Sequence, residues 1–106
     1  MLDNLIFKMY VIYKTRKEKG ISINKNYNTP KTGYMVGIKN FDNLKEMLKV
    51  KLEPNQYYGT WLDVKTGITY YDISLNVIDY KEACNIAQER KEIAIFDIQN
   101  KCSIYF

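Results

Sequence analysis

The sequence predicts an α+β domain, a two-layer sandwich in which an antiparallel or mixed sheet of about five strands is covered by two to three helices. Alternating apolar residues mark short strands, apolar residues three and four positions apart mark helices, and turn residues separate the two kinds of segment. A length of 106 residues predicts a single domain, 1–106. Within it we expect a basic N-terminal helix and mobile connection in 1–32 and a β-α-β-β-α-β-β body in 33–106.

The N-terminal segment favours a helix that ends before Gly20, with cations in its last turns. Residues 9–13 are also rich in strand formers, so a strand is the alternative. We expect the helix to pack through one apolar stripe: Leu2, Leu5, Ile6, Met9 and Tyr13. Residues 21–33 read as a connection with a short strand around 21–23.

The body begins with a half-buried strand in which Tyr34, Val36 and Ile38 share one face. Asp42 is expected to cap a helix that Pro54 prevents from continuing. The apolar stripe of that helix is Leu44, Met47, Leu48 and Leu52.

The segment YYGTWLDVKTGITYYDIS, residues 57–74, predicts a β-hairpin with its turn at 64–67, where Asp63 accepts from turn amides. This register pairs Trp61 with Tyr70 and Gly59 with Asp72 on one side of the ribbon. The other side has no formal charge, so we expect it to be buried and Trp61 and Tyr70 to be exposed. An alternative places Trp61 and Tyr70 beneath the N-terminal helix as a buried pair.

A second helix starts at Asp79 and carries Tyr80, Ala83, Cys84 and Ala87 on one face. A closing hairpin follows, formed by 93–96 and 102–106. The last strand offers a sheet edge through which a homodimer can form. We expect Cys84 and Cys102 to be small core residues.

Composition argues against catalysis. The chain contains no histidine, which removes the commonest general base, and neither cysteine has metal-type spacing. We therefore expect no catalytic residue, metal or cofactor. Asp63 and Asp72 share a face, but no third group supports a catalytic pair.

The positive charge is concentrated near the N-terminus, where residues 1–32 hold seven Lys or Arg and two Asp or Glu. These side chains suggest phosphate contacts as an alternative function: Lys14, Arg16, Lys17, Lys19 and Lys25. Arginine is scarce, so nucleic acid is the less favoured partner. No segment suits a membrane span and no secretory signal is evident, so we expect a cytoplasmic protein.

Residues 33–106 resemble small accessory proteins of phages and mobile elements, of the anti-CRISPR inhibitor type. The resemblance lies in three short segments: GYMVGI, W-x-D-x-x-TG and AIFD. That resemblance implies a non-enzymatic protein that blocks a bacterial CRISPR-Cas complex by stoichiometric occlusion. It transfers no site residue. The residues we expect to anchor a protein partner are Trp61, Tyr70, Asp72 and Tyr57.

Overall fold

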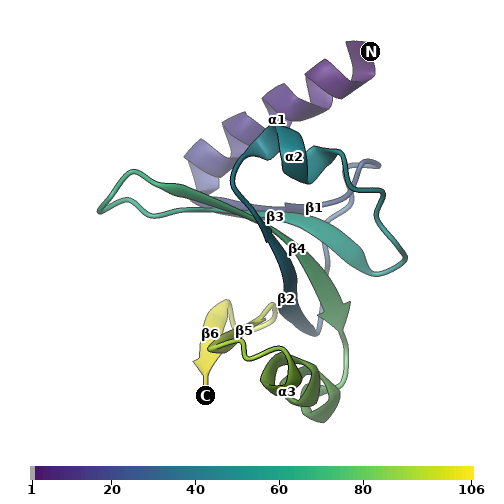
Figure 1. Cartoon of the computed structure of the whole chain (residues 1–106), viewed down its shortest axis with the longest axis vertical. Helices are drawn as coiled ribbons and strands as arrows, with labels where there is room; N and C mark the ends of the chain where they lie inside the picture. Colours follow the sequence, from purple (N-terminus) through teal and green to yellow (C-terminus); the bar gives the residue numbers. More distant parts are fainter. Residues whose placement is uncertain (1) are drawn as a thin grey trace.

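A computed structural model describes residues 2–106, and its three helices and six strands confirm the α+β prediction (Figure 1). The helices are α1 (Leu2–Glu18), α2 (Leu44–Leu48) and α3 (Tyr80–Glu89). The strands are β1 (Gly20–Ile23), β2 (Tyr34–Phe41), β3 (Gln56–Leu62), β4 (Thr69–Val77), β5 (Ala94–Asp97) and β6 (Cys102–Tyr105).

All six strands belong to one antiparallel sheet with the order β1-β3-β4-β2-β5-β6. The short strand expected near residue 21 therefore joins the sheet as its first edge, and β6 forms the other edge. A β-bulge interrupts the pairing of β2 with β4 between Gly37 and Lys39. The sheet curls, so that the β3–β4 hairpin and the β5–β6 hairpin project toward the same side of the molecule (Figure 1).

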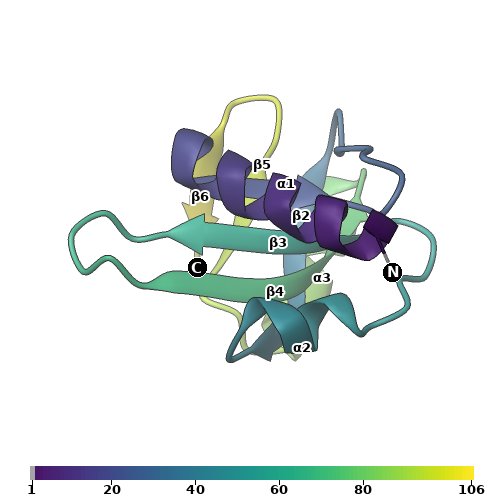
Figure 2. The same cartoon turned by 90° about the horizontal axis from the view of Figure 1, so that it is seen from above.

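The three helices cover the same face of the sheet, the outer face of the curl (Figures 1 and 2). Helices α1 and α2 share one apolar cluster: Phe7, Val11, Ile23, Leu44, Met47, Tyr58 and Ile73. Helix α3 closes a second cluster: Val36, Val77, Ala83, Ala87 and Ile95. On β4, Ile73 and Val77 point to the same side, so one continuous strand face supplies both clusters.

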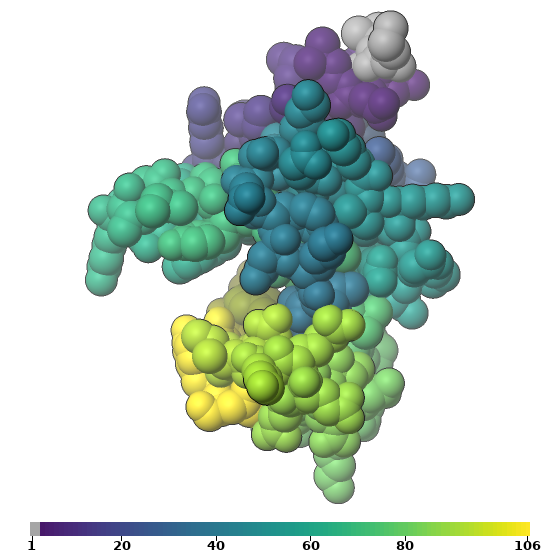
Figure 3. Space-filling view, viewed as in Figure 1, coloured from purple at the N-terminus to yellow at the C-terminus, as the bar shows by residue number. Residues whose placement is uncertain are grey.

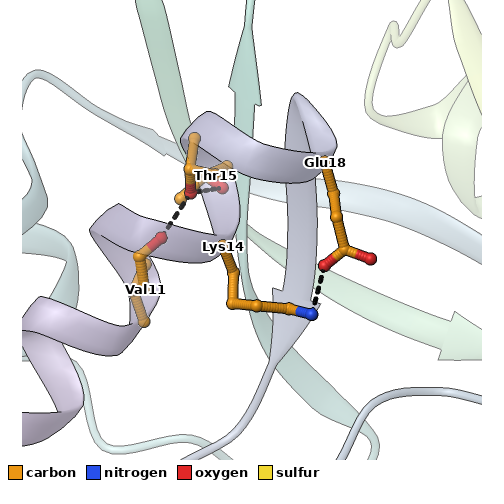
Figure 4. A network of polar contacts seen from close by, with 5 residues as sticks. Val11, Lys14, Thr15 and Glu18 are labelled. Atoms are coloured by element: carbon orange, nitrogen blue, oxygen red, sulfur yellow. Dashed lines mark hydrogen bonds and ion pairs between the residues drawn. The ribbon is translucent and has the colours of Figure 1, made fainter.

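A buried pair of hydroxyl groups fastens α1 to the sheet (Figure 4). Thr15 Oγ1 donates to the carbonyl oxygen of Val11 at 2.7 Å and lies 2.5 Å from Thr60 Oγ1 of β3. The proton of Thr15 is already used, so Thr60 is the donor in the bond between the two hydroxyls. Both threonines are buried, and this bond satisfies polar groups that would otherwise be costly there.

The prediction that α1 packs through the stripe containing Leu5, Ile6, Met9 and Tyr13 is wrong. These four side chains are exposed, and α1 packs instead through Phe7, Val11 and Thr15. Leu2 of the same predicted stripe has a side chain outside the described part of the structure. The helix carries apolar residues on two sides, so apolar spacing alone did not identify the side that meets the sheet.

The prediction for α2 is wrong in its start and its length. Asn43, rather than Asp42, is the N-cap, and its side chain accepts from the amide of Glu46. The helix ends at Leu48, where the Val50 amide bonds the Met47 carbonyl in a tightened last turn. Tyr58 Oη then donates to the Val50 carbonyl at 2.6 Å, which supplies the tertiary reason for the early end. Leu52 follows in the connection to β3.

The other predicted elements are confirmed with small shifts in their ends. Asp63 accepts from the Lys65 amide at 3.0 Å, and Gly67 has a φ of 75°, as the turn requires. Asp79 caps α3 through the Glu82 amide. The closing hairpin is β5–β6. Cys102 is exposed at the start of the edge strand β6, so its prediction as a core residue is wrong.

Candidate binding face of the sheet

The strand register determines which side chains share the face opposite the helices. In β3 and β4 the observed pairs are Trp61 with Tyr70 and Gly59 with Asp72, which is the predicted register. Tyr57 lies on the same side as Gly59, because side chains two positions apart in a strand share a face. We call this helix-free, inward-curving side the open face. Its residues in the two central hairpin strands are Tyr57, Gly59, Trp61, Tyr70, Asp72, Ser74 and Asn76.

Trp61 and Tyr70 form a stacked and solvent-exposed pair on the open face. Their ring centroids are 5.5 Å apart with an interplanar angle of 25°, and 57% of Trp61 and 50% of Tyr70 are exposed. The alternative that placed both rings beneath the N-terminal helix is wrong, because α1 packs on the other face of the sheet. Cross-strand stacking limits the rotamers of both rings, so little side-chain entropy remains to be lost on binding.

The open face curves inward between the two hairpins, and two glycines there leave room for the Asp72 carboxylate. The space-filling view shows a recess between the β3–β4 hairpin, in green, and β6, in yellow (Figure 3). A Cβ atom on Gly59 would stand 2.1 Å from Asp72 Oδ1, so the carboxylate lies directly against the glycine backbone. A Cβ atom on Gly37 would stand 3.3 Å from Asp72 Oδ2 and 3.4 Å from Glu92 Oε1.

Two further aromatic residues belong to the open face but come from the C-terminal hairpin. Phe96 pairs with Met35 and Ser103, and Tyr105 pairs with Ala94, so both rings continue the same side of the sheet. Both are exposed. The sequence analysis did not select them, although the alternation in the AIFD strand marks one of them as outward-facing.

Asp72 is the electrostatically unusual group of the open face. Partial burial raises its pKa, the hydrogen bond from Ser74 Oγ at 3.2 Å opposes that rise, and the nearby Glu92 carboxylate adds to it. Among residues 2–106 the ion pairs are Lys14–Glu18 and Lys49–Glu46, so no cation of the described chain is paired with Asp72. The open face therefore presents a poorly compensated negative charge beside two exposed aromatic rings.

Replacing Asp72 by asparagine is expected to stabilise the folded chain near neutral pH. The pKa of Asp72 is raised on folding, so the folded state holds its proton more tightly and loses stability as pH rises through that higher pKa. The side-chain oxygen of Asn can still accept the hydrogen bond from Ser74. Because Asn does not ionise, the stability that wild type loses as pH rises is retained. Denaturant unfolding at several pH values should show a gain for Asp72→Asn at pH 7 that disappears near pH 3.

The control is Glu92→Gln, which removes only the neighbouring charge and should give a smaller gain with the same pH dependence. If the free energies of unfolding of wild type and Asp72→Asn differ by the same amount at pH 3 and pH 7, the ionised Asp72 carboxylate does not destabilise the fold.

The two carboxylates that the sequence places on one side of the hairpin do not form a pair. Asp63 and Asp72 occupy different settings, because Asp63 caps the hairpin turn while Asp72 lies against Gly59. Across residues 2–106, no three His, Cys, Asp or Glu side chains gather closely enough to hold a metal ion. The open face therefore offers a binding partner contact area together with the charge of Asp72.

The basic residues predicted from the N-terminal third do not gather on a single surface. Lys14 is paired with Glu18 at 2.6 Å (Figure 4), and Lys19 Nζ donates to the carbonyl oxygen of Arg16. Lys17 lies over the Tyr13 ring, and Lys25 lies in the connection between β1 and β2.

Arg16 instead lines a groove of about 380 Å³ between α1 and α2. Lys8 and Lys45 join it there, and the lining contains no Asp or Glu. Sequence analysis missed Lys8 and Lys45 because they come from different helices that only the fold brings together.

Comparisons with known protein families, curated proteins and solved structures found no match. No helix within residues 2–106 is long and apolar enough to cross a membrane. Functional assignment therefore rests on the geometry and chemistry of the residues themselves.

Proposed function

We propose that this protein is a non-enzymatic, protein-binding inhibitor that acts by stoichiometric occlusion through its open face. The observation that supports it most is the exposed stack of Trp61 on Tyr70 on a sheet face without a helix over it. Monomeric proteins seldom expose large aromatic groups in clusters unless the cluster has a partner. Aromatic residues with a polar handle are also the commonest energetic anchors of protein interfaces.

The shape and charge of the open face favour a protruding partner segment that carries positive charge. Gly37 and Gly59 leave room for the Asp72 carboxylate on the inward-curving sheet, while Trp61 and Phe96 stand on the two hairpins that flank it. A Lys or Arg side chain entering this recess would meet the Asp72 and Glu92 carboxylates beside the faces of aromatic rings. Such a contact would also favour the ionised form of Asp72, whose pKa is raised mainly by burial and further by the Glu92 carboxylate.

The target we propose is a CRISPR-Cas effector of the host bacterium, in line with the resemblance of residues 33–106 to anti-CRISPR proteins. The exposed stack of Trp61 on Tyr70 offers contact area on the open face, which suits a blocker that remains bound. Such an inhibitor titrates its target, whereas an enzyme inactivates many copies in turn.

The test is a titration of target DNA cleavage by purified CRISPR-Cas effectors of several types with increasing amounts of this protein. We expect inhibition of at least one effector to be complete near one inhibitor per effector, with recovery after dissociation. Inhibition at far below equimolar amounts would indicate an enzyme. A panel in which no effector is inhibited or bound would reject the proposed target class.

A second candidate function is nucleic-acid binding, and the observation that favours it is the cationic groove between α1 and α2. Lys8, Arg16 and Lys45 line that groove. Contacts of this kind release counterions, so the apparent affinity would fall steeply with salt. Fluorescence anisotropy with labelled DNA and RNA at 50 and 200 mM salt decides the matter, because absent or salt-insensitive binding rejects this candidate.

A further inference from the structure

Helix α1 has a second apolar face that no part of the described chain covers. Its inner side packs on the sheet through Phe7 and Val11, which are 4% and 1% exposed. The outer side carries an apolar stripe whose members are 36% to 60% exposed: Leu5, Ile6, Met9, Tyr13 and, at its edge beside the groove between α1 and α2, Ile12. Figures 1 and 2 show α1 as the outermost element on its side of the molecule, so the stripe faces away from the fold.

The stripe is symmetric about Met9. At about 100° per residue, its five side chains occupy an arc of about 120° whose centre is Met9. Leu5 and Ile12 lie on one side of that centre, four residues before it and three residues after it. Ile6 and Tyr13 lie on the other side, three residues before and four after. Rotation by 180° about an axis through Met9 therefore superposes an apolar residue on an apolar residue at every position.

We propose that the stripe binds the same stripe of a second copy of this chain, with the two α1 helices antiparallel and Met9 at the two-fold axis. A two-fold interface uses the same patch on both subunits, and that patch must complement itself. In this arrangement Leu5 meets Ile12 of the second copy, and Ile6 meets Tyr13 of the second copy. Residues 5 and 12 are seven positions apart in the sequence, as are residues 6 and 13. A seven-residue repeat keeps apolar side chains on the side of a helix that contacts its neighbour.

One pair of opposite charges beside the stripe favours the antiparallel orientation. Asp3 in the first turn and Lys17 in the last turn lie on the same side of the stripe, about 120° and about 80° from Met9 in one direction. Antiparallel docking brings Asp3 of each copy near Lys17 of the other. Parallel docking would instead place the two Lys17 side chains on opposite flanks of the contact and leave Asp3 at its far end. Lys17 Nζ already lies 5.7 Å from the centroid of the Tyr13 ring, beside the proposed contact.

The available area fits a reversible dimer. Five side chains that are each about half exposed offer roughly 500 Å² per copy and about 1,000 Å² for the pair, near the lower limit of specific interfaces. Interfaces at this end of the size range are weak or transient, so we expect dimerisation to be reversible. This proposal does not depend on the proposed function, because the stripe and the open face lie on opposite sides of the sheet.

Sedimentation equilibrium of the full chain between about 1 μM and 1 mM tests the dimer. We expect reversible dimerisation that Met9→Glu weakens at least tenfold, because each dimer would bury two opposed carboxylates on the axis. The matched control is Val64→Glu, since Val64 is 67% exposed in the β3–β4 turn and should leave dimerisation unchanged. A chain that stays monomeric at 1 mM, or a dimer indifferent to Met9→Glu, overturns the proposal.

Cysteine cross-linking tests the orientation, in a chain whose own thiols are removed by Cys84→Ala and Cys102→Ser. We expect Leu5→Cys chains mixed with Ile12→Cys chains to form disulfide-linked pairs of one chain of each kind under mild oxidation. Leu5→Cys chains that link mainly to one another would indicate parallel helices and overturn the arrangement. A dimer that survives Met9→Glu and is broken by Ser103→Pro would place the contact at the β6 edge instead.

Discussion

A chain in which both Trp61 and Tyr70 are replaced by alanine is expected to fold normally and to bind its protein partner at least about 30-fold more weakly. Both rings are about half exposed and stack on each other rather than on the core, so their removal opens no internal cavity. Each is the kind of residue whose truncation at the centre of an interface commonly costs about 2 kcal/mol or more. The two losses are coupled through the stack, so they should not add fully.

Isothermal titration calorimetry measures the affinity, and circular dichroism with thermal unfolding checks the fold. The matched control is Ile78→Ala, because Ile78 is similarly exposed but follows the end of β4 and lies beside Gly33. We expect this control to bind like wild type. If the double variant keeps its fold and its full affinity, Trp61 and Tyr70 are not the anchors.

Replacing Tyr58 by alanine is expected to lower the free energy of unfolding by about 3–5 kcal/mol, the range seen for buried aromatic residues. Tyr58 is 1% exposed, packs among residues of α1, α2 and β4, and is one of the largest fully buried side chains. Its hydroxyl also holds the segment after α2 through the Val50 carbonyl. The free energy of unfolding of a domain of this size is roughly 5–15 kcal/mol in total, so much of the variant should be unfolded at 37 °C.

Denaturant unfolding measures this loss, and Tyr58→Phe separates the ring from the hydroxyl. Phe keeps the packing and leaves the Val50 carbonyl without its donor, so we expect a loss of about 1 kcal/mol. Burial raises the pKa of Tyr58, so wild-type stability should also fall as pH rises above the ordinary tyrosine pKa near 10. That part of the alkaline sensitivity should be absent in Tyr58→Phe. A loss below about 1 kcal/mol for Tyr58→Ala would contradict its central role in packing.

Local chemistry was sufficient to predict the β3–β4 hairpin and its register. Asp63 and Gly67 suit only a narrow set of turn geometries, and that turn determines which side chains face each other for the length of both strands. The charge-free side of the ribbon then had to be the buried one. The exposure of Trp61 follows from these two steps, without knowledge of the remainder of the fold.

Tertiary contacts determined the features that sequence reasoning missed. Helix α1 offers apolar residues on two sides, and the choice between them depends on how Thr15 meets Thr60 of β3. The early end of α2 depends on a hydroxyl eight residues away along the chain, that of Tyr58. Periodicity within a segment contains no information on either contact.

The parts of the candidate site that combine residues from different elements could not be predicted from the sequence either. Glu92 and Phe96 join the open face only because the sheet curls and β5 pairs with β2. Their distance along the chain from Asp72 gives no hint of this proximity. The cationic groove of Lys8, Arg16 and Lys45 has the same origin, since its members come from two helices.

The most direct test of the central claim uses the single tryptophan of this chain, Trp61, as a reporter on the open face. A sample containing 5-fluorotryptophan gives one ¹⁹F resonance, which can be followed during titration with the partner and compared in H₂O and D₂O. We predict a resonance that is solvent-sensitive in the free protein and that shifts and loses this sensitivity in the complex. A partner that binds in full while the Trp61 resonance stays unchanged would contradict the assignment of the open face as the binding surface.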